Sequence, residues 1–170
     1  TRDRVDALDL DVDSLLGHTG EAQAAGLAWL QVSDVVLVDL QDELGDAVAA
    51  EIDGAYVHAD VTKSAEVQAA VDAAMEMAPL RVLVNCAGIG PPARTLNREG
   101  EPHDLGHYET VIRINLMGTF NCIRLAAAAM ATTEPLADGE RGAIVNTASV
   151  AAYDGQIGQA AYASSKGGVV

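Results

Sequence analysis

The chain has 170 residues, of which 49% are hydrophobic and 21% charged, enough for one globular domain with its own core. Its formal net charge is −15 without any cluster of Lys and Arg, so we expect neither a nucleic-acid partner nor an anionic membrane surface. It contains no run of 18 apolar residues of the kind that crosses a membrane.

The first 30 residues are the least regular part of the sequence. The segment ALDLDVDSLLG alternates apolar and acidic residues, as a half-exposed strand does, whereas the first strand of an α/β domain is buried on both faces. Gly17 and Gly20 are candidates for a dinucleotide-binding turn, in which closely spaced glycines let the backbone approach a pyrophosphate. The alternative is an ordinary loop that leads into a helix.

From residue 35 onward, predicted strands and helices alternate. The β-branched run 35–40 predicts a buried strand, 42–52 has helical spacing, and 55–61 predicts a second strand. Thr62 is a candidate N-cap for the next helix, which ends at Pro79. The apolar face of that helix consists of Val67, Val71, Ala74, Met75 and Ala78.

The alternation continues to the end of the chain. We predict a buried strand in 80–90, a loop over 91–106, a long helix over 107–131, a strand in 142–149 and a last helix that begins near residue 162. This order predicts a Rossmann-like α/β fold, a doubly wound parallel sheet with helices on both faces. We expect residues 1–170 to form a single domain.

Tyr162 and Lys166 are the strongest catalytic candidates. Residues four apart on a helix share a face, and an ammonium beside a phenol stabilises the phenolate, which lowers the usual phenol pKa of about 10. Such a phenol can exchange a proton with an alcohol or ketone oxygen. Ser149 ends a predicted strand, where ligand sites of α/β sheets lie, and could bind the same oxygen. Taken alone, a Tyr–Lys pair is more often an ordinary pair on a helix surface; the strand-end serine thirteen residues earlier and the sequence Ser-Lys-Gly-Gly around Lys166 make this combination much more specific.

Carboxylates end two of the predicted strands. Asp39 could accept both ribose hydroxyls of an adenine nucleotide and would repel a 2′-phosphate, which favours NAD over NADP. Asp60 ends the following strand in the sequence ADVT. The structural alternatives are an N-cap or a solvated acid for Asp39 and a helix cap for Asp60.

The segment NCAG, residues 85–88, lies in the second half of the stretch 80–90, where the predicted strand ends in a glycine turn. Gly88 would let the backbone approach a cofactor, and Asn85 would tie adjacent strands together. We interpret Cys86 as a small packed residue. Because Cys122 is the only other cysteine and no close pair exists, we expect a reduced, cytoplasmic protein without a metal site.

Two polar residues have open interpretations. Asn115 lies inside the long predicted helix, where a polar side chain often faces solvent. Gln156 lies between Ser149 and Tyr162, where it could line a pocket or lie on the surface of a loop.

These motifs together resemble those of a known family. The stretches VVLVDL, ADVT, LVNCAGI, INLMGTFNCIRL and IVNTASVAAYDGQIGQAAYASSKGG are similar to short-chain dehydrogenases/reductases. The long loop RTLNREGEPHDLGHYE narrows the resemblance to the branch of type 10 17β-hydroxysteroid and short-chain 3-hydroxyacyl-CoA dehydrogenases. The resemblance is dense over residues 35–170.

The resemblance implies an NAD-dependent oxidoreductase that interconverts a secondary alcohol and a ketone on a small molecule, a hydroxyacyl-CoA or a steroid-like alcohol. It implies that Tyr162 is the general acid/base, that Lys166 assists it and holds the nicotinamide ribose, and that Ser149 orients the substrate. Asn115 would anchor a water-linked proton relay, and Gln156 would lie near the substrate. The other implied cofactor-binding residues are Asp39, Asp60, Val61, Asn85, Cys86, Ala87 and Gly88.

Two features depart from the family pattern. Where the family has a Thr-Gly-x-x-x-Gly-x-Gly loop, this chain has LDLDVDSLLGHTGEA. Family members are also longer than this chain, so we expect a C-terminally truncated domain. In the family, the helix that carries Lys166 builds the interface of a homotetramer, and the truncation puts that assembly in doubt for this chain. The alternatives to an active enzyme are an incomplete, non-catalytic nucleotide-binding fragment and a chain whose open sheet edge prevents stable folding.

Overall fold

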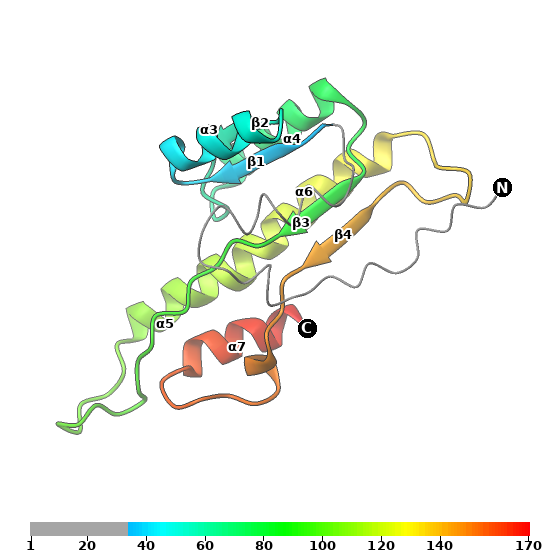
Figure 1. Cartoon of the computed structure of the whole chain (residues 1–170). Coiled ribbons are helices and arrows are strands. Elements are labelled where there is room, and N and C mark those ends of the chain that lie inside the picture. Colours follow the sequence, from blue (N-terminus) through cyan, green and yellow to red (C-terminus); the bar gives the residue numbers. More distant parts are fainter. Residues whose placement is uncertain (1–33) are drawn as a thin grey trace. The chain divides into compact units, whose positions relative to one another are not determined.

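The computed structural model describes residues 34–170 (Figure 1). They belong to two compact units, one ending at His58 and the other comprising Ala59–Val170, and each is described by itself. The predicted glycine turn with Gly17 and Gly20, like the rest of the irregular first segment, lies outside the described residues. The single-domain organisation stays a prediction.

The first unit contains β1 (Val36–Asp39), α3 (Asp42–Glu51) and β2 (Ala55–His58). The two strands are parallel, with Val36 opposite Ala55 and Asp39 opposite His58. α3 is the crossover connection that parallel strands require. These three elements confirm the strand–helix–strand order predicted from residue 35 onward.

The second unit contains the parallel strands β3 (Val82–Asn85) and β4 (Ala143–Asn146). Its helices are α4 (Ser64–Met77), α5 (Leu105–Ile112), α6 (Thr119–Thr132) and α7 (Ala160–Val169). A π-helical turn, η1 (Arg113–Gly118), joins α5 to α6, and a 3₁₀ turn, η2 (Val150–Ala152), follows β4. The helix predicted over 107–131 is therefore observed as one helical segment over 105–132 with an irregular centre.

The strands are less buried than predicted. Parallel pairing is confirmed in both units, but no residue of β1 to β4 is fully buried. Each strand has one paired neighbour among the described residues, so part of each strand's apolar surface stays accessible; Val82 and Val145 are 42% and 39% exposed. The prediction of fully buried strands is wrong for this part of the chain.

Thr62 is not the N-cap of α4, because the helix begins one residue later, after Lys63. The amide and the hydroxyl of Thr62 both donate to Asp60 Oδ1, at 2.9 and 2.8 Å. A carboxylate is a stronger acceptor than a hydroxyl, so the Thr62 side chain acts as a donor and Asp60 fixes the turn before the helix. The helix-cap role considered for Asp60 from the sequence is therefore not observed, because the N-cap of α4 is Lys63 and no side chain caps the helix.

The core of the second unit lies between α4, α6 and the strand pair. Val71, Ala126 and Met130 form its buried centre, and the surrounding side chains are Met75, Leu80, Leu83, Leu125, Ala129 and Ile144. The segment Leu105–Thr132 is long and apolar enough to cross a membrane by length and composition alone. Since Ala126 and Met130 pack in this core, we interpret the segment as a core helix of an α/β unit.

Gly142 gives a test of the packing at the start of β4. A Cβ at this position would lie 2.5 Å from the Arg81 carbonyl oxygen, which already accepts a hydrogen bond from Ala143 N. We expect Gly142→Ala to lower the free energy of unfolding by about 1–3 kcal/mol, measured by urea denaturation, because the backbone has to shift.

Gly167→Ala is the matched control, since its nearest neighbour would be the Ala152 carbonyl at 3.8 Å. Within α7 this change should be neutral or stabilising by up to about 1 kcal/mol. Equal destabilisation by both changes would contradict crowding at Gly142.

Candidate active site

Lys166 occupies the centre of the candidate site. It lies on α7, only 5% of its surface is exposed, and its Nζ donates a hydrogen bond of 2.6 Å to the carbonyl of Thr147, just after β4. Burial lowers the pKa of Lys166, and electrostatic interaction with Cys86 opposes part of that shift. The side chain is thus fixed between α7 and the carboxyl end of β4.

Tyr162 lies one helical turn before Lys166, and its ring centroid is 5.8 Å from Lys166 Nζ. The ring also lies close to the loop after β3, since a Cβ at Gly90 would be 3.2 Å from Tyr162 Cδ2. By contrast, Tyr153 is 80% exposed. The structure therefore separates a tyrosine packed beside a buried ammonium from one on the surface.

Asn115 is completely buried, so the solvent-facing interpretation of this residue is wrong. Its Oδ1 accepts a hydrogen bond from Ile89 N, and its Nδ2 donates to Ile89 O, both at 2.8 Å. Nδ2 also donates to Ser165 Oγ at 3.0 Å, and that hydroxyl in turn donates to Tyr162 O at 2.7 Å. Asn115 therefore connects the loop after β3 to the helix that carries Tyr162.

The backbone around Asn115 departs from regular α-helix. Asn115 lies within the π-helical turn η1, and its own carbonyl accepts a hydrogen bond from Thr119 Oγ1 at 2.7 Å. Single π turns inside α-helices are frequent at functional sites. The turn places a polar side chain in the interior, near the middle of the helical segment 105–132.

The NCAG segment begins at the carboxyl end of β3, opposite the end of β4 to which Lys166 is hydrogen-bonded. Asn85 Nδ2 donates to Asn146 Oδ1 at 2.8 Å, which confirms the predicted tie between adjacent strands. Cys86 Sγ accepts a contact of 3.6 Å from the hydroxyl of Thr147. A Cβ at Gly88 would lie 3.2 Å from the Asn115 amide oxygen, so the bare backbone of Gly88 allows this loop to approach η1.

Ser149 and Gln156 lie in the connection between β4 and α7. Ser149 is the N-cap of η2, where its Oγ accepts a hydrogen bond of 3.2 Å from Ala151 N. Gln156 lines a cavity together with residues of the loop after β3. No hydrogen bond links Ser149 to Tyr162 in the described part of the chain, so the proposed shared contact to a substrate oxygen stays a prediction.

The remaining predicted cofactor residues form two separate groups. In the second unit, Asp60 fixes the turn before α4, and the Val61 carbonyl accepts a hydrogen bond of 2.8 Å from Asn121 Nδ2. In the first unit, Asp39 Oδ1 accepts hydrogen bonds from the amides of Leu40 and Gln41, at 2.7 and 3.0 Å. Asp39 is therefore a strand-end carboxylate anchored to its own turn.

Sequence reasoning missed three residues that support the site: Ile89, Thr147 and Ser165. Ile89 and Thr147 act through backbone atoms, so their side-chain types carry no signal. Ser165 is the exception, because it acts through its side-chain hydroxyl. Its position directly before Lys166 on the last helix could have indicated a role in the site.

The chain is similar to known proteins both in sequence and in structure. The short chain dehydrogenase family matches residues 19–170 of the chain. The chain is 45% identical to the human 3-hydroxyacyl-CoA dehydrogenase type-2 over 161 residues, which cover 89% of this chain and 62% of the human protein. It is 38% identical to a 3-alpha-(or 20-beta)-hydroxysteroid dehydrogenase of Mycobacterium bovis, covering 78% of this chain and 48% of that protein.

A solved structure of 3-hydroxyacyl-CoA dehydrogenase type-2 from Mycobacterium avium matches with a TM-score of 0.81 and 43% identity, over 88% of this chain and 60% of the other. This agreement confirms the predicted Rossmann-like α/β fold class. The chain spans about three fifths of the length of these type-2 relatives. The family match extends over most of the sequence, so the chain belongs to the short-chain dehydrogenase family.

Proposed function

We propose that the protein is an NAD-dependent oxidoreductase that interconverts a secondary alcohol and a ketone, of the 3-hydroxyacyl-CoA or hydroxysteroid type. The observation that carries the proposal is the buried Lys166 ammonium, held by the Thr147 carbonyl beside the Tyr162 ring. The names of the relatives support the two substrate classes.

The proposed chemistry is a proton transfer at Tyr162 coupled to hydride transfer. In the oxidative direction the alcohol gives its O–H proton to the Tyr162 phenolate, and the Lys166 ammonium stabilises the negative charge that the phenolate carries beforehand. The Ser149 hydroxyl would donate a hydrogen bond to the substrate oxygen. A bound NAD supplies the hydride acceptor, C4 of the nicotinamide, while the protein contributes positioning and the proton pathway.

The loop after β3 packs directly against the candidate acid/base. Gly88 and Gly90 lack the side chains that would collide with Asn115 and Tyr162, so the backbone of the loop lies next to these two residues. We propose that Cys86, Ala87 and Gly88 lie along the cofactor and that Lys166 holds the nicotinamide ribose. Asp39 would accept the adenosine ribose hydroxyls, and its negative charge favours NAD over NADP.

The direct test is NADH formation, followed by absorbance, from a 3-hydroxyacyl-CoA and from a hydroxysteroid, with NADP in parallel. Turnover with NAD supports the proposal. Turnover with NADP alone would contradict the role of Asp39, and no turnover with either cofactor would contradict the function.

The alternative is a nucleotide-binding protein without catalysis, and alkylation of the cysteines tests binding separately from turnover. Cys122 is buried, and its burial raises the pKa to about 11, so it should react slowly at pH 8. Cys86 is half-buried and lies along the proposed cofactor. We expect saturating NAD to slow Cys86 alkylation by iodoacetamide at least about tenfold, as measured by mass spectrometry.

Cys122 provides the internal control, because NAD should leave its slow modification unchanged. Equal Cys86 rates with and without NAD would contradict the placement of the cofactor. Protection without turnover would favour the non-catalytic alternative.

A further inference from the structure

The turn 60–62, which leads into α4, is held by residues far from it in the sequence. Asn121 of α6 is 8% exposed, and its Nδ2 donates a hydrogen bond of 2.8 Å to the carbonyl of Val61. A Cβ at Gly118 would lie 2.6 Å from Val61 Cγ2, so this glycine lets the end of η1 approach the Val61 side chain. Val61 is therefore fixed both by a hydrogen bond and by close packing against residues 118–121.

The hydrogen bond from Asn121 also orients a peptide group of this turn. The C=O and the N–H of a trans peptide point in opposite directions. In the peptide between Val61 and Thr62, the carbonyl faces Asn121 Nδ2. The N–H of the same peptide donates to Asp60 Oδ1 at 2.9 Å. The orientation of the peptide, and with it the hydrogen bond to Asp60, therefore depends on Asn121.

The Asn121 amide itself is held in one orientation. Its Oδ1 accepts hydrogen bonds from Ser64 Oγ at 3.1 Å and from Arg124 Nε and Nη2 at 3.0 and 2.7 Å. Arg124 Nη2 also donates to Ser64 Oγ at 2.7 Å. With the amide turned over, its NH₂ would face these donors and its oxygen would face the Val61 carbonyl. Only the observed orientation satisfies all the partners, so the donor to Val61 is fixed in place.

We propose that Asn121 is a positioning residue for the cofactor, which holds Asp60 and Val61 in the arrangement that receives the adenine-nucleotide half of NAD. This inference rests on the proposed function and on the cofactor contacts that the resemblance implies for Asp60 and Val61. Asn115 lies in the same helical segment, 105–132, and is connected through Ser165 to Tyr162. One segment therefore fixes both the acid/base and the turn 60–62, through two different asparagines.

Asn121→Asp tests the inference, because it keeps an oxygen for Ser64 and Arg124 and removes only the donor to Val61. We expect KM for NAD to rise about tenfold, since the turn loses a buried hydrogen bond and two oxygens face each other. At saturating NAD, kcat should stay within about twofold, because the contacts of the acid/base are unchanged. A purely structural role would instead lower kcat with the fraction of folded protein and leave KM for NAD unchanged.

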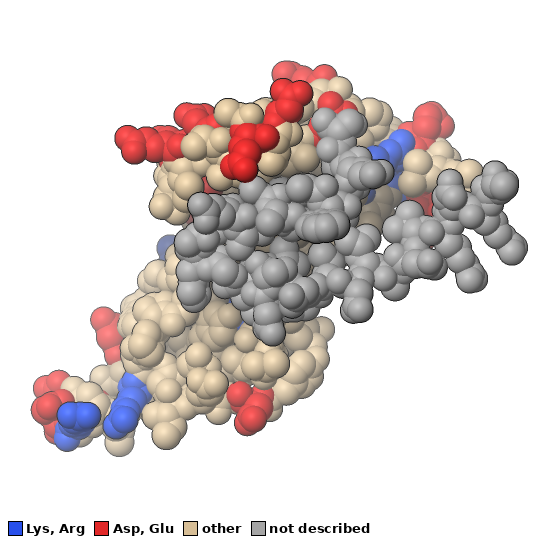
Figure 2. Space-filling view, viewed as in Figure 1, with Lys and Arg blue, Asp and Glu red and all other residues tan. Residues whose placement is uncertain are grey.

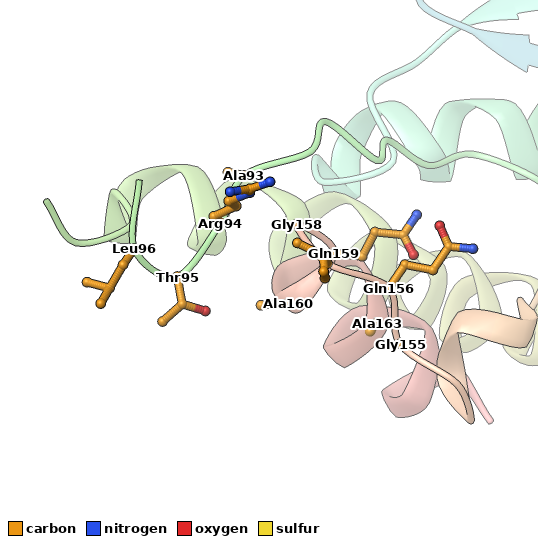
Figure 3. Close-up of a pocket in the computed structure, with 11 residues that line it drawn as sticks. Ala93, Arg94, Thr95, Leu96, Gly155, Gln156, Gly158, Gln159, Ala160 and Ala163 are labelled. Carbon is orange, nitrogen blue, oxygen red and sulfur yellow. The ribbon is translucent and has the colours of Figure 1, made fainter. Parts of the chain in front are cut away.

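Binding of the alcohol provides a further readout. The cavity next to α7 lies between the loop 93–96 and the segment 155–160, and neither Asn121 nor the turn 60–62 lines it (Figure 3). KM for the alcohol should therefore change less than about twofold in Asn121→Asp. Equal increases of KM for NAD and for the alcohol would contradict a specific effect on the cofactor.

Gly118→Ala reaches the same turn without a change of charge. The added Cβ would lie 2.6 Å from Val61 Cγ2, so the Val61 side chain has to move. We expect KM for NAD to rise at least about threefold. This variant keeps the inference testable if Asn121→Asp does not fold, and an unchanged KM for NAD in Gly118→Ala would contradict the role of the turn.

Gln68→Glu is the matched control for Asn121→Asp. The chain has a net charge of −15, and acidic side chains are spread over the face shown in Figure 2, so any added carboxylate disfavours an anionic nucleotide. Gln68→Glu adds the same charge and also removes an amide donor, the exposed one that Gln68 Nε2 directs to Asp72 Oδ1. KM for NAD should change less than about twofold. An equal rise in both variants would overturn the inference, since charge alone would then explain it.

Calorimetry with ADP, an adenine nucleotide without nicotinamide, separates this inference from the proposed function. ADP binding that weakens about tenfold in Asn121→Asp supports the inference even if no alcohol is oxidised. Unchanged ADP binding in Asn121→Asp, or NAD-dependent turnover with an unchanged KM for NAD, would overturn the inference and leave the proposed function to its own test. Absence of both turnover and ADP binding in the unchanged protein would overturn both.

Discussion

Replacing Tyr162 with phenylalanine is expected to lower kcat for alcohol oxidation by about 10²–10⁴-fold, the usual contribution of a positioned acid or base. Phenylalanine keeps the ring that packs beside Gly90 and Lys166 but removes the hydroxyl. The measurement is steady-state NADH formation with the preferred substrate. Calorimetric NAD binding should change little, because the cofactor-binding residues stay in place.

Tyr153→Phe is the matched control for this change. Both tyrosines follow β4, but Tyr153 lies in the segment before α7 and is 80% exposed, whereas Tyr162 lies on α7 with its ring beside Lys166. We expect Tyr153→Phe to leave kcat within about twofold of the value for the unchanged protein, since substitutions on the surface away from the site have small effects. Full activity of Tyr162→Phe would rule out the proposed acid/base, and equal losses in both variants would point to a general structural effect.

Local sequence patterns predicted the order of elements well. The β-branched runs gave all four described strands, and the apolar face with Val67 and Val71 gave a helix that packs into the core. The degree of strand burial was not predictable in the same way. Burial depends on how many neighbours a strand has, and each strand here has one paired neighbour among the described residues.

The start of α4 shows a second limit of sequence reasoning. Both Thr62 and Asp60 have side chains that can satisfy backbone amides near a helix start. The structure decides between them through the acceptor strength of the carboxylate, which takes both the amide and the hydroxyl of Thr62. The local sequence showed that both side chains could accept hydrogen bonds near the start of the helix. It did not show that the Thr62 hydroxyl would instead donate to Asp60.

The candidate site was predictable only in part for a similar reason. The spacing of Tyr162 and Lys166 is local and places both on one helix face. Burial of Lys166 by Thr147, and of Asn115 by Ile89 and Ser165, depends on contacts between segments far apart in the sequence. The contacts at Thr147 and Ile89 use backbone carbonyls and amides, which every residue type has, so no sequence pattern indicates them; the Ser165 hydroxyl is the exception, since it is a side-chain group.

Replacing the buried Asn115 with alanine is expected to lower the free energy of unfolding by about 3–5 kcal/mol. The change leaves the amide and the carbonyl of Ile89 and the hydroxyl of Ser165 without their partner inside the protein. Each unsatisfied buried group costs about 1–3 kcal/mol. Urea denaturation measures the difference.

Asn97→Ala is the matched control, since Asn97 also takes part in three side-chain hydrogen bonds. All three are exposed, so water can replace the lost amide, and we expect a loss of about 1 kcal/mol or less. Equal losses for Asn115→Ala and Asn97→Ala would contradict the role of burial at η1.

A double-mutant cycle with Ser165→Ala tests whether Asn115 acts on the catalytic helix. Because Asn115 Nδ2 donates to Ser165 Oγ, which donates to the Tyr162 carbonyl, the two substitutions should be coupled by about 0.5–3 kcal/mol. Ser165→Ala alone should lower kcat more than it changes KM for the alcohol, because it loosens the turn that carries Tyr162. Additive effects on stability would mean that Asn115 stabilises the loop at Ile89 only. The position of Tyr162 would then depend on Lys166 and on the packing of its ring against Gly90.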